Sequence, residues 1–197
     1  MLNLEQGARL VKLARKAIQS KFSILKLKDD KKMRDEFSEM LGCFVTLHKN
    51  SQLRGCIGFP EPVMPLYDGI VRAAESAAFK DPRFPPVEKD ELGLINVEIS
   101  VLTRPRRIDV RNPEDYVKHI RVGRDGLIVR ETFNSGLLLP QVATEQRWDA
   151  LNFLRQTCVK ANLKPDDWQD FDRVRVYKFQ SQVFGESSPE GEVLQVM

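Results

Sequence analysis

A cation, two glycines and a thiol occur within six residues of this chain, in the segment Leu53-Arg54-Gly55-Cys56-Ile57-Gly58. A guanidinium binds carboxylate and phosphate groups through paired donors. A glycine lets a neighbouring backbone or a ligand approach closely because it has no Cβ. These residue types make the 53–58 segment the first candidate for a functional site.

The thiol of Cys56 has two interpretations. It is either a reactive nucleophile or a small apolar residue packed beside the glycines, since free cysteine is among the most frequently buried residue types. Arg54, two residues away, is a cation that would favour the thiolate. A nucleophilic cysteine usually also needs a base, most often histidine, and the chain has only His48 and His119.

The position of Cys56 depends on the register of a hairpin that is predicted between residues 42–48 and 52–57. A two-residue turn would place Cys43 opposite Cys56, and a four-residue loop would place Val45 there instead. Only the first register would allow a Cys43–Cys56 disulfide, because a diagonal pair lies too far apart.

Both registers give the same faces, because side chains alternate along a strand. Arg54 and Cys56 would lie on one face, and His48 on the other. The face of Cys56 would also carry the odd-numbered residues of the first strand, Cys43, Val45 and Leu47. An odd-length loop or a β-bulge would invalidate this assignment.

A cation on a largely apolar face needs a partner or a ligand. For Arg54 the structural alternative is an internal salt bridge with Glu98 or Asp81. The functional alternative is a clamp for a carboxylate or phosphate group, with Gly55 and Gly58 allowing the ligand to approach.

Further polar residues could complete a site with the 53–58 segment. Glu98 and Ser100 alternate with apolar residues in the strand predicted over 95–102, so they face either solvent or a cleft. Asp81 and Arg83 form either a rigid loop with its own ion pair or part of a ligand site. With Gln141 these side chains would line a polar cavity. The candidate catalytic residues are Cys56 and Glu98, and the candidate ligand-binding residues are Arg54, Gly55, Gly58, Asp81, Arg83, Ser100 and Gln141.

Composition narrows the class of protein. The 197 residues are 42% hydrophobic and 30% charged, which is typical of a soluble globular protein. Three irregularly spaced cysteines argue against a secreted disulfide framework and against a zinc site. No apolar run approaches the ~20 residues of a membrane span, and the first residues do not resemble a signal peptide. We therefore expect a cytoplasmic protein that needs no cofactor or metal, and neither a Walker loop nor a dinucleotide fingerprint is present.

Basic residues gather in one part of the chain, although the net charge is only +3. They favour an alternative function as an interaction module that binds nucleic acid or protein. No interleaved aromatic residues accompany them, as a stacking platform would require. The cluster comprises Arg104, Arg106, Arg107, Arg111, Arg121, Arg124 and Arg130.

The predicted elements favour an α+β fold with largely antiparallel sheets and flanking helices. Residues 1–186 are expected to form one domain of two subdomains with a cleft between them, residues 104–107 a connection, and residues 187–197 a flexible tail. Residues 26–32 read as a charged surface loop. Helices are predicted over 4–20, with an Asn3–Gln6 capping box, from Pro65 to Ala78, from Asn112 to His119 and along 148–161; strands are predicted over 95–102, 126–130, 136–139 and within 173–184.

Taken in order, several of these segments resemble the AMMECR-type domain family over residues 4–186. The 53–58 segment is the hallmark of that family. The others include Phe44–Leu47, Asp81–Pro86, Val97–Leu102 and Leu138–Ala143. The resemblance implies an α+β fold in two subdomains with the motif near a cleft, but no established reaction. It also implies partners in a modification pathway, because such domains are often associated with Memo-like and radical-SAM proteins.

Overall fold

The computed structural model describes residues 1–23 and 29–196. The chain forms two compact units, unit 1 (Met1–Leu102 with Gln182–Met197) and unit 2 (Thr103–Ser181). Each unit has its own hydrophobic core and its own sheet with antiparallel pairing. The predicted α+β class is confirmed.

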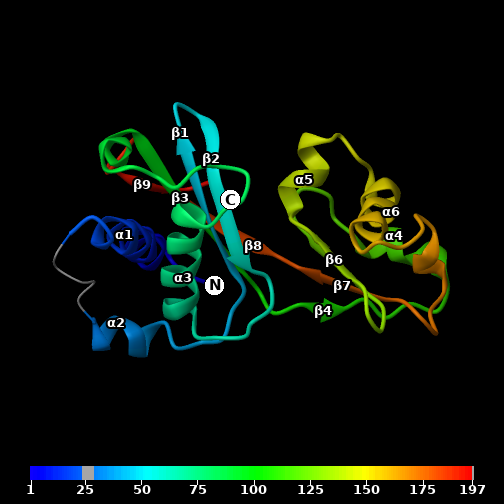
Figure 1. Ribbon diagram of the computed structural model, residues 1–197. Helices are drawn as coiled ribbons and strands as arrows, with labels where there is room; N and C mark the ends of the chain where they lie inside the picture. Colours follow the sequence, from blue (N-terminus) through cyan, green and yellow to red (C-terminus); the bar gives the residue numbers. More distant parts are fainter. Residues whose placement is uncertain (24–28, 197) are drawn as a thin grey trace. The chain divides into compact units, whose positions relative to one another are not determined.

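Unit 1 is built on a five-stranded sheet in the order β2-β1-β3-β8-β9 (Figure 1). The strands are β1 (Cys43–Lys49), β2 (Gln52–Phe59), β3 (Ile95–Leu102), β8 (Ser181–Glu186) and β9 (Val193–Gln195). β2 is an edge strand, and β1 pairs with both β2 and β3 in antiparallel fashion. The alternation predicted for 95–102 is confirmed as β3.

Helices cover one face of this sheet. α3 packs against β1 and β2, and α1 packs against α3, β3 and β9. The helices of unit 1 are α1 (Leu4–Ser20), α2 (Lys31–Glu36), α3 (Leu66–Phe79) and the 3-10 helix η1 (Lys89–Leu94). α1 begins with the predicted capping box, in which the Asn3 side chain accepts the backbone N–H of Gln6 and the Gln6 side chain accepts that of Asn3.

Two expectations for unit 1 differ from the structure. Within the charged loop expected over 26–32, residues 26–28 lie outside the described part of the chain, and Lys31 already begins α2 because Asp30 caps it. The expected tail contains strand β9, which pairs with β8, and Val193 is buried there.

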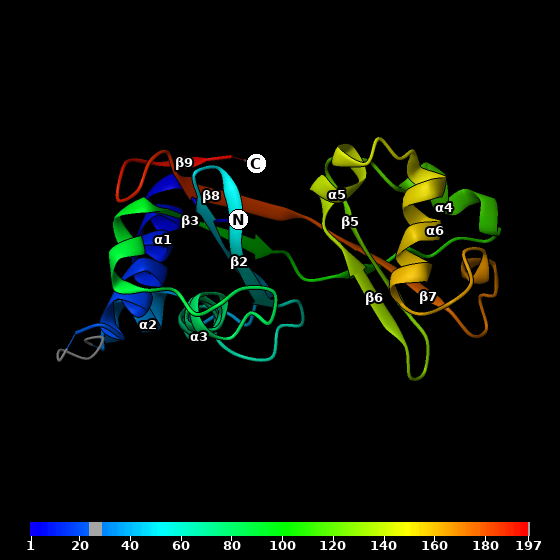
Figure 2. The ribbon, with the colours of Figure 1, turned by 45° about the horizontal axis from the view of Figure 1, so that its top comes forward.

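Unit 2 is built on a four-stranded sheet in the order β4-β7-β5-β6. Its helix α6 packs against β5 and β6 (Figure 2). Its strands are β4 (Arg106–Arg107), β5 (Gly126–Arg130), β6 (Ser135–Leu138) and β7 (Arg175–Phe179). Its helices are η2 (Pro113–Asp115), α4 (Tyr116–His119), α5 (Pro140–Glu145), α6 (Ala150–Lys160) and η3 (Asp167–Gln169).

Local chemistry sets several of these bounds. Arg106 and Arg107, expected in a connection, pair with β7 instead. α6 begins after Asp149, whose side chain accepts the N–H of Asn152, so Trp148 lies outside the helix. After α6, Asn162 adopts a φ of 60°, the left-handed conformation that asparagine tolerates at a helix C-terminus.

Candidate functional site

The β1–β2 hairpin contains a β-bulge at Arg54. Lys49 pairs with Gln52 and His48 with Leu53, but the next pair is Leu47 with Gly55. Arg54 is therefore the extra residue on β2. The turn between the strands is Asn50-Ser51, and both residues have positive φ, 52° and 63°, as a primed hairpin turn requires.

The bulge reverses the faces predicted for the hairpin. Beyond it Cys56 lies opposite Thr46, on the face that also carries His48. The predicted placement of Cys56 beside Cys43 and Val45 is wrong, because a one-residue shift moves every later side chain to the other face. Cys43 pairs with Phe59, and all three cysteines are free.

A row of three polar residues crosses neighbouring strands of this sheet. Thr46 on β1 lies opposite Cys56 on β2 and opposite Glu98 on β3. The Thr46 hydroxyl donates to the Cys56 Sγ, with 3.3 Å between Oγ1 and Sγ. We call the face with Cys56, Thr46, His48 and Glu98 the Cys56 face. All four residues are partly exposed, whereas the residues of the other face are buried in the core beneath the helices, among them Val45, Leu47, Val97 and Ile99.

Glu98 is a half-buried carboxyl group without a hydrogen-bond partner among the described residues. Burial raises its pKa, and the nearby His48 opposes this shift. A carboxyl group that favours its neutral form can donate a proton or a hydrogen bond. The role of Glu98 as a catalytic residue stays a prediction.

The backbone of Cys56 is held by the loop that contains Asp81 and Arg83. The Cys56 N–H donates to Asp81 Oδ2 at 2.8 Å, and its carbonyl oxygen accepts from Arg83 Nη2 at 3.1 Å. Asp81 and Arg83 also form an ion pair of 2.7 Å. Because β2 is an edge strand, backbone groups on its outer side have no neighbouring strand, and the loop satisfies those of Cys56.

Electrostatics fix the charge of this loop. Hydrogen bonding to Arg83 holds the pKa of the buried Asp81 carboxyl well below its usual range. Asp81 in turn raises the pKa of Arg83, and the proximity of Cys56 contributes to that increase. The Arg83 side chain is 53% exposed, so its charge also faces solvent next to Cys56. The loop has the predicted ion pair, and it positions Cys56 as well.

Arg54 forms a salt bridge with Glu91, a partner that the sequence did not indicate. Its Nε and Nη2 donate to the two carboxylate oxygens of Glu91 at 3.1 and 2.9 Å, and Nη1 and Nη2 donate to the carbonyls of Pro85 and Pro86. The side chains of Arg54 and Glu91 are only 12% and 14% exposed. Hydrogen bonds, first from Arg54 and then from Lys49, lower the pKa of Glu91 to about 2. The expectation of Glu98 or Asp81 as partner is corrected, because the bulge turns Arg54 toward the 85–91 segment.

The two glycines of the segment allow parts of the chain itself to pack closely. A Cβ on Gly55 would lie 2.2 Å from the carbonyl oxygen of Ala77 in α3. A Cβ on Gly58 would lie 2.3 Å from the carbonyl oxygen of Cys43 and equally close to the Phe44 ring. Their role as ligand-approach positions stays a prediction.

The last two predicted site residues lie in different units. Ser100 is buried and lies opposite Phe44 on the same side of the sheet as Glu98. Gln141 belongs to unit 2, where it follows Pro140 in α5. Its Oε1 is buried without a hydrogen-bond partner among the described residues. The grouping of Gln141 with the residues of unit 1 stays a prediction.

Sequence reasoning missed Thr46, His48 and Glu91 as neighbours of the 53–58 segment. The alternation of β1 does place Thr46 and His48 on one face, but only the bulge brings Cys56 to it. Glu91 offered a different signal, since it lies three residues after Glu88 in a capping box.

Among the residues that the structure describes, no cluster of three His, Cys, Asp or Glu could hold a metal ion. No helix in the same part of the chain is long and apolar enough to cross a membrane.

The fold is that of an α+β protein with two units, and Cys56 lies on the polar face of the antiparallel sheet of unit 1. The chain belongs to the AMMECR1 family, whose model matches residues 11–184. The predicted family resemblance is thereby confirmed.

Several archaeal proteins are similar to the chain over nearly its whole length. A protein of Methanothermobacter thermautotrophicus is 53% identical over 94% of this chain and 96% of its own length. Protein MK0488 of Methanopyrus kandleri is 49% identical over 98% of this chain and 94% of its own length. Among solved structures, the uncharacterized protein PH0010 from Pyrococcus horikoshii is similar with a TM-score of 0.88 and 44% identity, and the match covers 98% of both chains.

Proposed function

We propose that the protein binds a small polar or anionic ligand on the Cys56 face, and that it acts as an enzyme or accessory factor in a modification pathway. One observation carries the proposal: the thiol of Cys56 and the unpartnered carboxyl of Glu98 lie on either side of Thr46. Half-burial of a carboxyl without a partner costs free energy of folding, and a ligand that hydrogen-bonds to Glu98 would compensate this cost.

The chemistry of the face indicates what the ligand carries. A neutral Glu98 would donate a hydrogen bond to a carbonyl or carboxylate oxygen. Arg83 is paired with Asp81, but its guanidinium is partly exposed next to Cys56 and can offer its remaining N–H donors to an anionic group. In an enzyme, Cys56 would be the nucleophile and Glu98 the general acid.

The sequence indicated Arg54 as a possible clamp for a ligand anion, but in this proposal it has a structural role. Its donors are engaged by Glu91 and by two backbone carbonyls, so it stabilises the 85–91 segment. We therefore assign the contact with an anionic group of the ligand to Arg83 and not to Arg54. The link to Memo-like and radical-SAM proteins is supported by the family resemblance alone.

A thermal-shift screen with a metabolite library tests the proposal. A ligand should raise the melting temperature of the wild type and of a control with Glu145→Gln, an exposed residue of unit 2. Glu98→Ala should abolish the shift, and Glu98→Gln, which keeps a donor, should retain part of it. Equal shifts in the wild type, Glu98→Ala and Cys56→Ser would contradict the proposal.

The alternative function is a non-catalytic module that binds nucleic acid or protein, and charge distribution favours it. Unit 2 has fifteen Lys and Arg against eleven Asp and Glu, whereas unit 1 has sixteen against seventeen. Binding of RNA or DNA that weakens steeply with salt would support this alternative. If the protein binds neither RNA nor DNA near physiological ionic strength, a nucleic-acid-binding function is excluded.

A further inference from the structure

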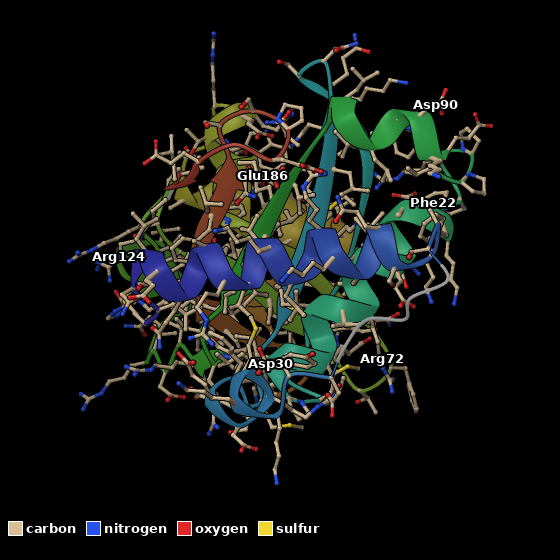
Figure 3. The ribbon with its side chains drawn as sticks, turned by 90° about the vertical axis from the view of Figure 1, so that its left-hand side faces the viewer. Phe22, Asp30, Arg72, Asp90, Arg124 and Glu186 are labelled. Carbon is tan, nitrogen blue, oxygen red and sulfur yellow. The ribbon has the colours of Figure 1, made fainter. Side chains whose placement is uncertain are left out.

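Unit 1 contains a pocket that lies apart from the residues of the Cys56 face. It has a volume of about 560 Å³, within the range of small-molecule sites. Its walls are one side of α1, the start of α2 and Tyr67 of α3. In Figure 3, α1 runs across the view with Asp30, a residue of the pocket wall, on one side and Asp90 on the other.

Four cations surround this pocket. Arg9, Lys12 and Lys16 share one side of α1, because residues three and seven positions apart lie on the same helix face, and Lys31 joins them from α2. Arg9 is neutralised by Glu36 at 2.5 Å. The three lysines are exposed and form no ion pair or hydrogen bond with any residue in the described part of the chain.

The acidic residues of the pocket do not balance these lysines. Asp29 pairs with Arg34 at 3.1 Å. Asp30 remains as a single carboxylate, and its Oδ1 accepts the N–H of Met33 at the start of α2. Arg34 also pairs with Asp68 at 2.6 Å, so Asp29 shares its cation with a second carboxylate. Three unpaired ammonium groups therefore line the pocket with Asp30 and a partly compensated Asp29. Because the Lys12, Lys16 and Lys31 side chains are exposed and unpaired, a polyanion can contact them without displacing an ion pair.

The floor of the pocket is apolar and well packed. Leu13, Met33 and Tyr67 line it, with exposed fractions of 5%, 7% and 2%. The guanidinium of Arg34 lies over the Tyr67 ring, 4.5 Å from its centroid, which fixes the ring. A ligand of matching chemistry has a multiply charged end for the lysines and a flat or apolar part for the floor.

We propose that this pocket binds a small phosphorylated molecule of the nucleotide type, with its phosphates on Lys12, Lys16 and Lys31 and its ring toward Tyr67. Lysine is a compact point charge that suits phosphate groups of varied geometry. A single carboxylate ligand would leave most of the positive charge uncompensated. The site is independent of Cys56, so the protein has a second place for a ligand.

Calorimetric titration of the full chain with ATP, AMP and inorganic pyrophosphate, without divalent metal and at about physiological salt, tests this site. ATP should bind, and Lys12→Gln with Lys16→Gln should weaken it at least tenfold. A control that removes two exposed lysines elsewhere, Lys89→Gln with Lys160→Gln, should change the affinity less than twofold. Cys56→Ser should bind ATP like the wild type, which separates this site from the Cys56 face.

Four results would overturn the proposal in whole or in part. The first is no ATP binding by the wild type, and the second is equal affinity in the wild type and the Lys12/Lys16 variant. The third is a duplex RNA that binds with dependence on Lys12 and Lys16 while ATP does not, since the lysines would then serve a macromolecule. Pyrophosphate binding as tightly as ATP would refute the role of Tyr67 and the apolar floor.

Discussion

Cys56 and Thr46 lie directly opposite each other in the β1–β2 pair, with the Thr46 hydroxyl 3.3 Å from the Cys56 sulfur. This contact exists because Arg54 forms a bulge and shifts β2 by one residue. It puts the thiol on the face of Glu98 and His48, away from the helices. The loop of Asp81 and Arg83 holds the backbone of Cys56 at the edge of the sheet through two hydrogen bonds.

Cys56 should be the most reactive of the three thiols. Cys43 and Cys158 are fully buried, and burial raises the pKa of Cys43 to about 12 and that of Cys158 to about 11. Treating the folded protein with iodoacetamide at neutral pH should alkylate Cys56 more than about tenfold faster than either. Mass spectrometry of peptides measures the three rates, and Cys56→Ser serves as the control. Labelling of Cys56 only after denaturation would rule out a reactive thiol.

Glu98 should make stability depend on pH in the direction opposite to a carboxylate whose pKa is lowered by an ion pair, such as Glu91. Its pKa is raised in the folded protein, so its contribution is fully present below the unfolded value of 4.5 and is lost as pH rises through the folded pKa. Glu98→Gln should therefore be more stable than the wild type at pH 7, and the difference should close below pH 4.

Urea unfolding at several pH values measures this difference, and an NMR titration of the Glu98 carboxyl carbon measures its pKa directly. His48→Gln should raise that pKa further, because the charge of His48 opposes the shift. A Glu98 that titrates at or below 4.5 would contradict the general-acid assignment.

The Arg54–Glu91 pair should contribute to stability except in acid. Removing one partner of a largely buried pair leaves the other charge unpaired, so Arg54→Ala should cost about 3 kcal/mol at pH 7. The matched control is Arg72→Ala in α3, whose exposed side chain is labelled in Figure 3 and should change stability by less than about 0.5 kcal/mol.

The acid dependence of this pair follows from the lowered pKa of Glu91. Its contribution is present above the unfolded value of 4.5 and is lost as pH falls toward about 2. Chemical denaturation between pH 7 and 2 should therefore show wild type and Arg54→Ala converging in acid. A constant difference across that range would mean that Arg54 acts through packing alone.

Gly55→Ala should be severely destabilising. The added Cβ would lie 2.2 Å from the backbone oxygen of Ala77. Relieving this clash requires α3 or β2 to shift, which would disturb their packing. We expect a loss of at least about 2 kcal/mol in urea unfolding. Gly93→Ala is the matched control, because nothing lies within 4 Å of its added Cβ. Similar stabilities for the two variants would show that α3 can move away from β2.

Local patterns in the sequence predicted most elements of the fold. The alternation of β3, the capping box of α1 and the turn after Lys49 depend on neighbours within a few residues. Helix α2 was missed because a six-residue helix has too short an apolar pattern to recognise. The family could likewise be identified from the order of the motifs.

The candidate site was predicted only in part. Cys56, Asp81 and Arg83 do lie together. The face of Cys56 and the partner of Arg54 were wrong, because both depend on a single extra residue in β2 that alternation does not reveal.

The sequence by itself therefore determined the class of most elements, the apolar face of β3 and the family, since each is encoded by local spacing and side-chain type. The tertiary structure decided that Cys56 faces Thr46 and Glu98, and that Arg54 pairs with Glu91. The physical reason is that a bulge exchanges the two faces of a strand at small local cost. Only packing across strands, helix α3 and the 81–91 segment selects that arrangement.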